Sequence, residues 1–142
     1  MHTVRQLLAL KGHQLFSVGP QDSVLRAIEV MATQHVGALL VMEAGALLGV
    51  ISERDYARKV ILMNRSSHDT TVATIMSAPV ITVGLGDTVK HCMEVCTGER
   101  IRHLPVVDGN AVVGIVSIGD LVKAMLQEQS QQIEQLERYI AG

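Results

Sequence analysis

Two clusters of one hydroxyl and one carboxylate recur in the sequence at the same spacing. The first is Ser52-x-x-Asp55 and the second is Ser117-x-x-Asp120, and each follows a glycine and two aliphatic residues. Apolar residues with helical spacing come after both clusters, which predicts that each cluster lies at the start of a helix. The free N–H groups at a helix N-terminus bind phosphate, and a carboxylate one turn further on can accept hydrogen bonds from the hydroxyls of a ribose. These residue types therefore indicate nucleotide binding.

The same residue types also form a capping box, in which the hydroxyl and the carboxylate satisfy backbone N–H groups at the helix start. This alternative predicts a stabilisation of about 0.5–2 kcal/mol for each cap and no ligand. Gly49 and Gly114, which precede the two clusters, leave room where a ligand ring could approach. The two short motifs leave capping and binding open.

Basic residues near the motifs favour binding of an anion. Arg54 lies inside the first motif, and Arg102 and His103 begin an apolar strand of the second half of the chain. Their counterparts in the first half are Gly37 and Ala38, so the two halves are unequal. A phosphate would need such positive charge close by.

The chain is a tandem repeat with an offset of 65 positions, which holds without a gap from Leu15/Val80 to Ile61/Leu126. A fixed-period repeat indicates that each copy is one supersecondary block. A single block of about 50 residues buries too little surface to be stable alone. We therefore expect two blocks packed sheet to sheet about a pseudo-twofold axis, with a cleft between them.

Each repeat is expected to read strand, helix, strand, strand, helix. The expected elements of the first repeat are a strand at 15–18, a helix at 22–34, strands at 38–42 and 46–51, and a helix at 53–63. Those of the second are a strand at 80–83, a helix at 87–96, strands at 103–107 and 111–116, and a helix at 117–127. Asp22 and Asp87 are expected to cap the first helix of each repeat.

These elements divide the chain into five segments: an N-terminal helix (1–12), repeat 1 (13–63), a polar linker (64–73), repeat 2 (74–128) and a C-terminal helical tail (129–142). Leu126, Ile133, Leu136 and Ile140 form an apolar stripe along the tail. Two heptads are few for a coiled coil, so the tail either docks on its own domain or contacts a second copy across a dimer interface.

Composition excludes several classes of function. The net charge is −2 and aromatic residues make up 2% of the chain, which argues against a nucleic-acid partner. No apolar run reaches the roughly 20 residues that cross a bilayer, so no membrane partner is expected. The N-terminus lacks the apolar segment of a secretory signal, and a reducing, cytoplasmic location follows.

No set of residues suggests an enzyme or a metal site. The serines lack a nucleophile elbow, no phosphate-binding loop of the Gly-x-x-x-x-Gly-Lys type is present, and the histidines lack zinc spacing. Cys92 and Cys96 align with the apolar face of a helix, where buried thiols are expected.

Taken together, these residues resemble the cystathionine-β-synthase (CBS) domain family, and the chain is similar to a stand-alone tandem pair, or Bateman module. The resemblance runs from Leu15 to Gln127. Its carriers are the two Gly-x-x-Ser-x-x-Asp motifs, the Ile101–Val107 strand, the aspartates that open the helices and the order of the elements. Ser52–Val60 also resembles a small bacterial and organellar type.

The resemblance implies an α+β fold, α/β-like in character, with an N-terminal and a C-terminal helix around two β-α-β-β-α CBS repeats. It implies a non-catalytic adenosine-nucleotide-binding regulatory or sensor module that controls an unknown downstream protein and forms a homodimer. The ligand would be AMP above all, or ADP, ATP, NAD(H) or S-adenosylmethionine, in the interdomain cleft without a metal. The alternative is a ligand-free structural or partner-binding adaptor in which the motifs only cap helices.

The resemblance also assigns residues to parts of the ligand. The ribose would be held by Asp55 and Asp120, the phosphate by Ser52, Ser117, Arg54, Arg102 and His103, and the base by Val18, Val36, Val83 and Ile101. Gly119 stands where some relatives have a second hydroxyl, which removes one phosphate contact from the second site.

Overall fold

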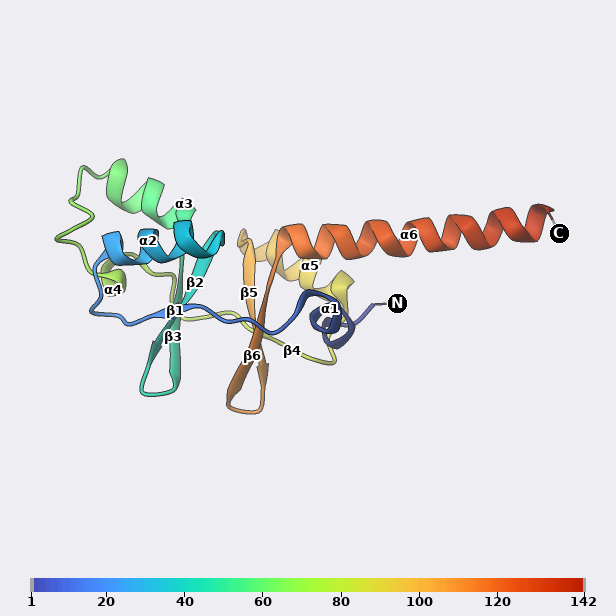
Figure 1. Cartoon of the computed structure of the whole chain (residues 1–142), viewed down its shortest axis with the longest axis horizontal. Coiled ribbons are helices and arrows are strands. Elements are labelled where there is room, and N and C mark those ends of the chain that lie inside the picture. Colours follow the sequence, from blue (N-terminus) through green and yellow to red (C-terminus); the bar gives the residue numbers. More distant parts are fainter. Residues whose placement is uncertain (1, 142) are drawn as a thin grey trace. The chain divides into compact units, whose positions relative to one another are not determined.

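The computed structural model describes residues 2–141 of the 142-residue chain (Figure 1). The chain divides into two compact units. Leu15–Ile81 is the first-repeat unit, and Met1–Gln14 together with Thr82–Gly142 is the second-repeat unit. Each unit contains one three-stranded sheet and helices, so the predicted α+β fold is confirmed. Within residues 2–141, no helix combines the length and apolar character needed to cross a bilayer.

The first-repeat unit is built around a β-hairpin. Its strands are β1 (Ser17–Val18), β2 (Ala38–Glu43) and β3 (Ala46–Ser52), and its helices are α2 (Val24–Gln34), α3 (Glu53–Tyr56), the π-helix η1 (Ala57–Ile61) and α4 (Val72–Ile75). β1 runs parallel to β2, and β2 pairs antiparallel with β3. Ala44 at φ 50° and Gly45 at φ 80° form the hairpin turn, which needs positive φ at both central residues.

The second-repeat unit repeats this arrangement. Its strands are β4 (Val83–Gly84), β5 (His103–Asp108) and β6 (Ala111–Ser117), and its helices are α1 (Val4–Lys11), α5 (Val89–Glu99) and α6 (Ile118–Ala141). His103 lies opposite Ser117 in the hairpin, as Ala38 lies opposite Ser52 in the first unit. Both hairpins also carry a bulge at the equivalent position, so the two sequence repeats have the same strand register.

Each unit contains a helix that lies outside its repeat in the sequence. α1 precedes the first repeat but packs in the second-repeat unit, where the Val4 N–H donates to the Asp87 carbonyl at 2.8 Å. α4 lies between the repeats and packs in the first-repeat unit, where the Val72 N–H donates to the Asp22 carbonyl at 2.8 Å. The two helices therefore occupy equivalent places, although the sequence predicted a polar linker (64–73) and no helix between the repeats.

Apolar side chains from sheet and helices form the core of the first-repeat unit. Its buried members are Val18, Val24, Ala27, Met31, Leu39, Val41, Ile51, Val60, Val72 and Ile75. In the second-repeat unit, Val4, Leu7 and Leu8 of α1 are buried, as their helical spacing predicts. The positions of both motifs depend on these cores, because the motifs end the hairpin strands that the cores hold.

The predicted caps of α2 and α5 were wrong by one residue. Ser23 is the N-cap of α2, and its Oγ accepts a first-turn backbone N–H at 3.1 Å. Asp22 instead accepts the Gly19 N–H at 2.8 Å and closes the loop before the helix. Thr88 and Asp87 divide the same roles in the second unit. Aspartate and serine are both good caps, so spacing alone did not separate them.

Two helices differ in extent from their predicted ranges. The helix expected at 53–63 is α-helical only over α3, after which η1 continues it with wider turns. The helix expected at 117–127 and the tail form one continuous helix, α6, of 24 residues. Its buried residues are Leu121 and Ala124, and every residue from 129 to 141 is exposed. Of the two alternatives that the sequence left open for the tail, docking on its own domain is therefore not seen for residues 129–141.

The glycines before the two motifs make room for protein atoms. A Cβ at Gly49 would lie 2.8 Å from Met76 Sδ and 2.9 Å from the Ser77 carbonyl oxygen. A Cβ at Gly114 would lie 2.8 Å from both methyl carbons of Leu8. The segment after α4 and helix α1 thus approach the two hairpins at the same point.

We expect Gly49→Ala to lower the free energy of unfolding by about 1–3 kcal/mol, because its Cβ would clash with backbone. Gly114→Ala should cost less, since the Leu8 side chain it meets can rotate away. Urea denaturation measures both, with Gly86→Ala as a control because a Cβ there meets nothing within 4 Å. A larger loss for Gly114→Ala than for Gly49→Ala would contradict this explanation.

Candidate functional site

The first motif forms a complete capping box where β3 leads into α3. Ser52 Oγ accepts the Asp55 backbone N–H at 3.2 Å. In return, Asp55 Oδ2 accepts the Ser52 backbone N–H at 2.9 Å and the Ser52 hydroxyl at 3.0 Å. The capping geometry that the sequence left open is therefore present, and it holds the hydroxyl and the carboxylate side by side.

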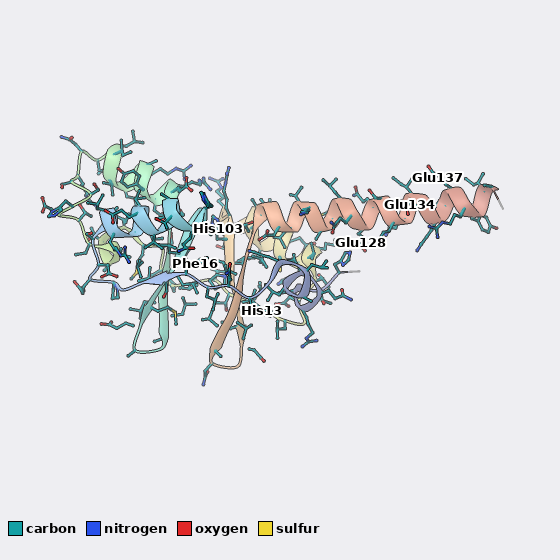
Figure 2. The ribbon with its side chains drawn as sticks, in the orientation of Figure 1. His13, Phe16, His103, Glu128, Glu134 and Glu137 are labelled. Carbon is teal, nitrogen blue, oxygen red and sulfur yellow. The ribbon has the colours of Figure 1, made fainter. Side chains whose placement is uncertain are left out.

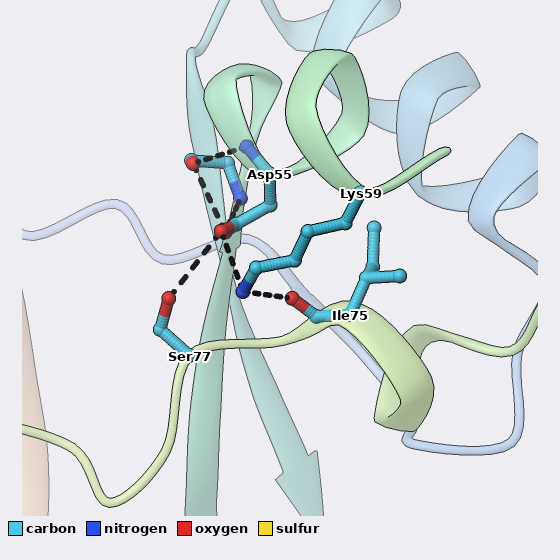
Figure 3. Close-up of polar contacts among 5 residues, drawn as sticks. Asp55, Lys59, Ile75 and Ser77 are labelled. Carbon is cyan, nitrogen blue, oxygen red and sulfur yellow. Dashed lines mark hydrogen bonds and ion pairs between the residues drawn. The ribbon is translucent and has the colours of Figure 1, made fainter. Parts of the chain in front are cut away.

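The other oxygen of Asp55 is also engaged by protein atoms (Figure 3). Lys59 Nζ lies 3.2 Å from Asp55 Oδ1 and donates to the Ile75 carbonyl at 2.9 Å. The Ser77 hydroxyl donates to Asp55 Oδ1 at 3.4 Å. The Asp55 side chain is only 12% exposed. A ribose hydroxyl could reach this carboxylate only by displacing or sharing these donors.

The second motif has the same box and a different lysine. Asp120 Oδ2 accepts the Ser117 N–H at 2.8 Å, and Ser117 Oγ accepts the Asp120 N–H at 3.1 Å. Lys11 of α1 places its Nζ 2.6 Å from Asp120 Oδ2 and 2.6 Å from the Ile115 carbonyl oxygen. Lys11 lies far from Asp120 in the sequence, so no local spacing could have identified this pair.

The environment of Asp120 favours its charged form. Partial burial by itself would raise the pKa of the carboxyl group. The hydrogen bonds from Lys11 and Ser117, together with the Lys11 charge, outweigh burial and lower the pKa of Asp120 below its usual value. Asp120 is 27% exposed at the side chain, so this carboxylate is more accessible than Asp55.

A small pocket opens beside Asp120 within the second-repeat unit. Its volume is about 230 Å³, and it is lined by His2, Leu7, Leu10, Lys11, Asp120, Lys123, Ala124 and Gln127. Pockets that enclose small molecules usually measure roughly 300–1,000 Å³. Two lysines and one carboxylate line the pocket, which is smaller than a site that would surround a whole nucleotide.

The basic residues predicted to bind phosphate lie close to the two motifs. Arg54 is the second residue of α3 and is half-buried. Arg102 is exposed, and its carbonyl accepts the Ile118 N–H at 2.8 Å at the start of α6. His103 begins β5 directly opposite Ser117 (labelled in Figure 2). The pairing of β5 with β6 thus brings His103 to the second motif.

The apolar residues predicted to hold a base fall into two classes. Val18 and Val83 lie in the short first strands and are buried within their own units. Val36 and Ile101 are half-buried and follow α2 and α5 at equivalent positions. The side chains of the second class therefore keep some exposed apolar surface just before the central strand of each sheet.

Cys92 and Cys96 lie on the buried face of α5 as free thiols. Burial, with smaller contributions from Asp87 and Cys96, raises the pKa of the Cys92 thiol to about 11. Within residues 2–141 no group of three or more His, Cys, Asp or Glu side chains could hold a metal ion. A thiol with so high a pKa is a poor nucleophile at neutral pH.

Comparison with known proteins places both repeats in one family. A family model described as the CBS domain matches residues 9–62 and 72–127. The chain is 42% identical over 126 residues to the mitochondrial CBS domain-containing protein CBSX3 of Arabidopsis thaliana, and this match covers 85% of the chain and 61% of CBSX3. It is 31% identical to the CBS domain-containing protein YhcV of Bacillus subtilis, covering 82% of the chain and 83% of YhcV. The chain thus spans about three fifths of the first relative.

Solved structures agree with the fold. The CBS-domain-containing protein ATU1752 of Agrobacterium tumefaciens has a TM-score of 0.83 and 35% identity, covering 87% of the chain and 98% of that protein. The CBS domain pair of protein MJ0100 has a TM-score of 0.80 and 25% identity, covering 90% of the chain and 98% of that pair. MJ0100 was solved in complex with 5′-methylthioadenosine and S-adenosyl-L-methionine.

We expect Asp120→Asn to destabilise the protein at neutral pH by about 0.2–1 kcal/mol, the range for a partly exposed ion pair. Because folding lowers the pKa of Asp120, its charge stabilises the fold above the usual carboxyl pKa, and this stability is lost as the pH falls through the lowered value. The difference between wild type and variant should therefore shrink below about pH 4. Thermal unfolding from pH 3 to 7 measures it.

The control for this pH dependence is the same substitution in a Lys11→Met background. There the carboxylate has no ion-pair partner at 2.6 Å, so most of the pH-dependent difference should disappear. A difference that stays constant from pH 7 to pH 3 in the wild-type background would rule out a stabilising Lys11–Asp120 pair.

Proposed function

The chain belongs to the CBS-domain family, and from this premise we propose that it is a non-catalytic regulatory module that binds an adenosine-type ligand and thereby controls a partner protein. The observation that carries the proposal is the pairing of a hydroxyl and a carboxylate at the same place in both repeats, within the two segments that match the family model. The adenosyl compounds bound to the CBS pair of MJ0100 support the class of ligand.

In this proposal the ligand is AMP above all, with ADP, ATP, NAD(H) and S-adenosylmethionine as the other candidates. Asp55 and Asp120 accept hydrogen bonds from ribose hydroxyls. The remaining roles go to Ser52, Ser117, Arg54, Arg102 and His103 for the phosphate and to Val18, Val36, Val83 and Ile101 for the base. Location in the cytoplasm and assembly into a homodimer stay predictions from the sequence.

The lysines bound to the two carboxylates give the proposed site a mechanism. A ribose whose hydroxyls donate hydrogen bonds to Asp55 or Asp120 competes with Lys59 or Lys11. The displaced ammonium group lies within reach of the phosphate, where it offsets negative charge. Lys11 belongs to α1, so binding at Asp120 changes the contacts that hold α1 in place. A ligand can shift a conformational equilibrium only through such a difference in contacts between two states.

Calorimetric titration with AMP, ATP, NADH and S-adenosylmethionine tests the proposal. We expect Asp55→Asn or Asp120→Asn to raise the Kd of the bound ligand by about tenfold or more, because a charged acceptor for two hydroxyls is lost. Asp69→Asn, in the exposed loop before α4, is the matched control and should leave the Kd unchanged. Mass spectrometry of the purified protein adds an independent readout, since a co-purified nucleotide identifies the ligand directly.

A ligand-free adaptor is the second candidate, and the completeness of both capping boxes favours it. Both carboxylates are already satisfied by backbone, hydroxyl and lysine donors. The adaptor predicts that the aspartate variants lower thermal stability while no adenosyl compound gives heat or a thermal shift. Lowered stability of the aspartate variants, with no heat or thermal shift from any of the four compounds, would contradict the nucleotide proposal and support the adaptor.

A further inference from the structure

Helix α6 has two apolar faces, and only one of them is covered by its own unit. Leu121 and Ala124 are buried against the second-repeat unit. The second face is exposed and consists of Val122, Leu126, Ile133, Leu136 and Ile140, which we call the outer stripe. Exposed fractions in the outer stripe rise from 40% at Val122 to 82% at Ile140.

The outer stripe follows a heptad repeat. With Gln129 included, its positions are 122, 126, 129, 133, 136 and 140, which alternate steps of four and three residues. This spacing places Leu126, Ile133 and Ile140 at a positions and Val122, Gln129 and Leu136 at d positions. Because α6 is one continuous helix, the stripe covers almost three heptads, more than the sequence of the tail indicates.

No residue in the outer half of α6 (129–141) is buried against the rest of its unit. Every residue from 129 to 141 is exposed, and Figure 2 shows Glu134 and Glu137 on the part of α6 that extends past α1 and α5 of the same unit. A single helix of this length is marginal in water without packing of an apolar face. An apolar stripe with heptad spacing is the surface that pairs with another helix.

We propose that the outer stripe pairs with the outer stripe of a second copy of this chain, in an antiparallel two-helix coiled coil. In that arrangement Leu126 lies opposite Leu136 of the second copy, and Ile140 lies opposite Val122 of the second copy. Ile133 lies opposite Gln129 of the second copy, which places the one polar position near the centre of the pair. Every a position then meets a d position, as antiparallel pairing requires.

The charges beside the stripe select the antiparallel orientation. Lys123 and Glu137 occupy e positions, and antiparallel pairing sets Lys123 beside Glu137 of the second copy twice in each dimer. In a parallel pair the same two residues would lie beside Ile118 and Gln132, which carry no charge. Parallel pairing would also bring two second-repeat units to the same end of the coiled coil. Charge complementarity therefore favours the antiparallel pair of identical helices.

Sedimentation velocity of the full chain without nucleotide tests the pairing. The wild type should be a reversible dimer, and Ile133→Asp should raise its Kd by about tenfold or more because a charge enters the stripe. Lys123→Glu and Glu137→Lys alone should each weaken the dimer, since each sets like charges side by side. The double variant Lys123→Glu/Glu137→Lys should restore the wild-type Kd to within about threefold, because the opposite charges are exchanged.

Matched controls lie on the faces of α6 away from the stripe. Gln135→Asp and Glu134→Lys make comparable changes at exposed positions and should leave the Kd unchanged. A monomer at about 100 µM, a dimer indifferent to Ile133→Asp, or a double variant no tighter than the single ones would each overturn the proposal. The assay contains no ligand, so its result is separate from that of the calorimetric test. Circular dichroism checks that Ile133→Asp still folds. If Ile133→Asp does not fold, the Lys123 and Glu137 variants test the pairing of the two helices.

Discussion

The structure depends on one local interaction that occurs twice, the exchange of hydrogen bonds between a serine and the aspartate three residues later. Ser52 and Asp55 lie where the first hairpin ends and a helix begins, and Ser117 and Asp120 lie at the same point of the second hairpin. The exchange satisfies backbone donors that the helix start would leave without partners. It also sets a carboxylate at the end of the second hairpin strand of each unit. The atoms that stabilise the start of each helix are therefore the same atoms that are proposed to bind the ligand.

The two carboxylates differ in the origin of the lysine that faces each of them. Lys59 follows Asp55 by one helical turn, so that pair is local and persists with its own helix. Lys11 reaches Asp120 from α1, whose position depends on packing against a sheet formed much later in the chain. The more exposed carboxylate is thus the one held by the remote lysine. This difference gives the nearly identical motifs distinct electrostatic surroundings.

Local patterns predicted most of the fold and the close pairing within each motif. Alternation of apolar runs and turns located both hairpins, and the 65-residue offset predicted their common architecture. The sequence did not predict the features that depend on tertiary contacts, among them α4, the unit in which α1 packs and the Lys11–Asp120 pair. The tail was separated from the preceding helix because the chain becomes rich in glutamine and glutamate there. No proline or glycine interrupts the helix between Asp120 and Ala141, so backbone preferences alone allow the continuous helix.

The packing of α1 in the second-repeat unit has a consequence for synthesis on the ribosome. The first-repeat unit is contiguous, so all of Leu15–Ile81 has been translated before the second repeat is complete. Helix α1 is made before both repeats, yet the rest of the unit in which Val4, Leu7 and Leu8 are buried is translated after the first repeat. The apolar face of α1 is therefore without its native cover during most of translation. Burial of Val4, Leu7 and Leu8 is therefore a late step of folding, because it has to wait for the second repeat.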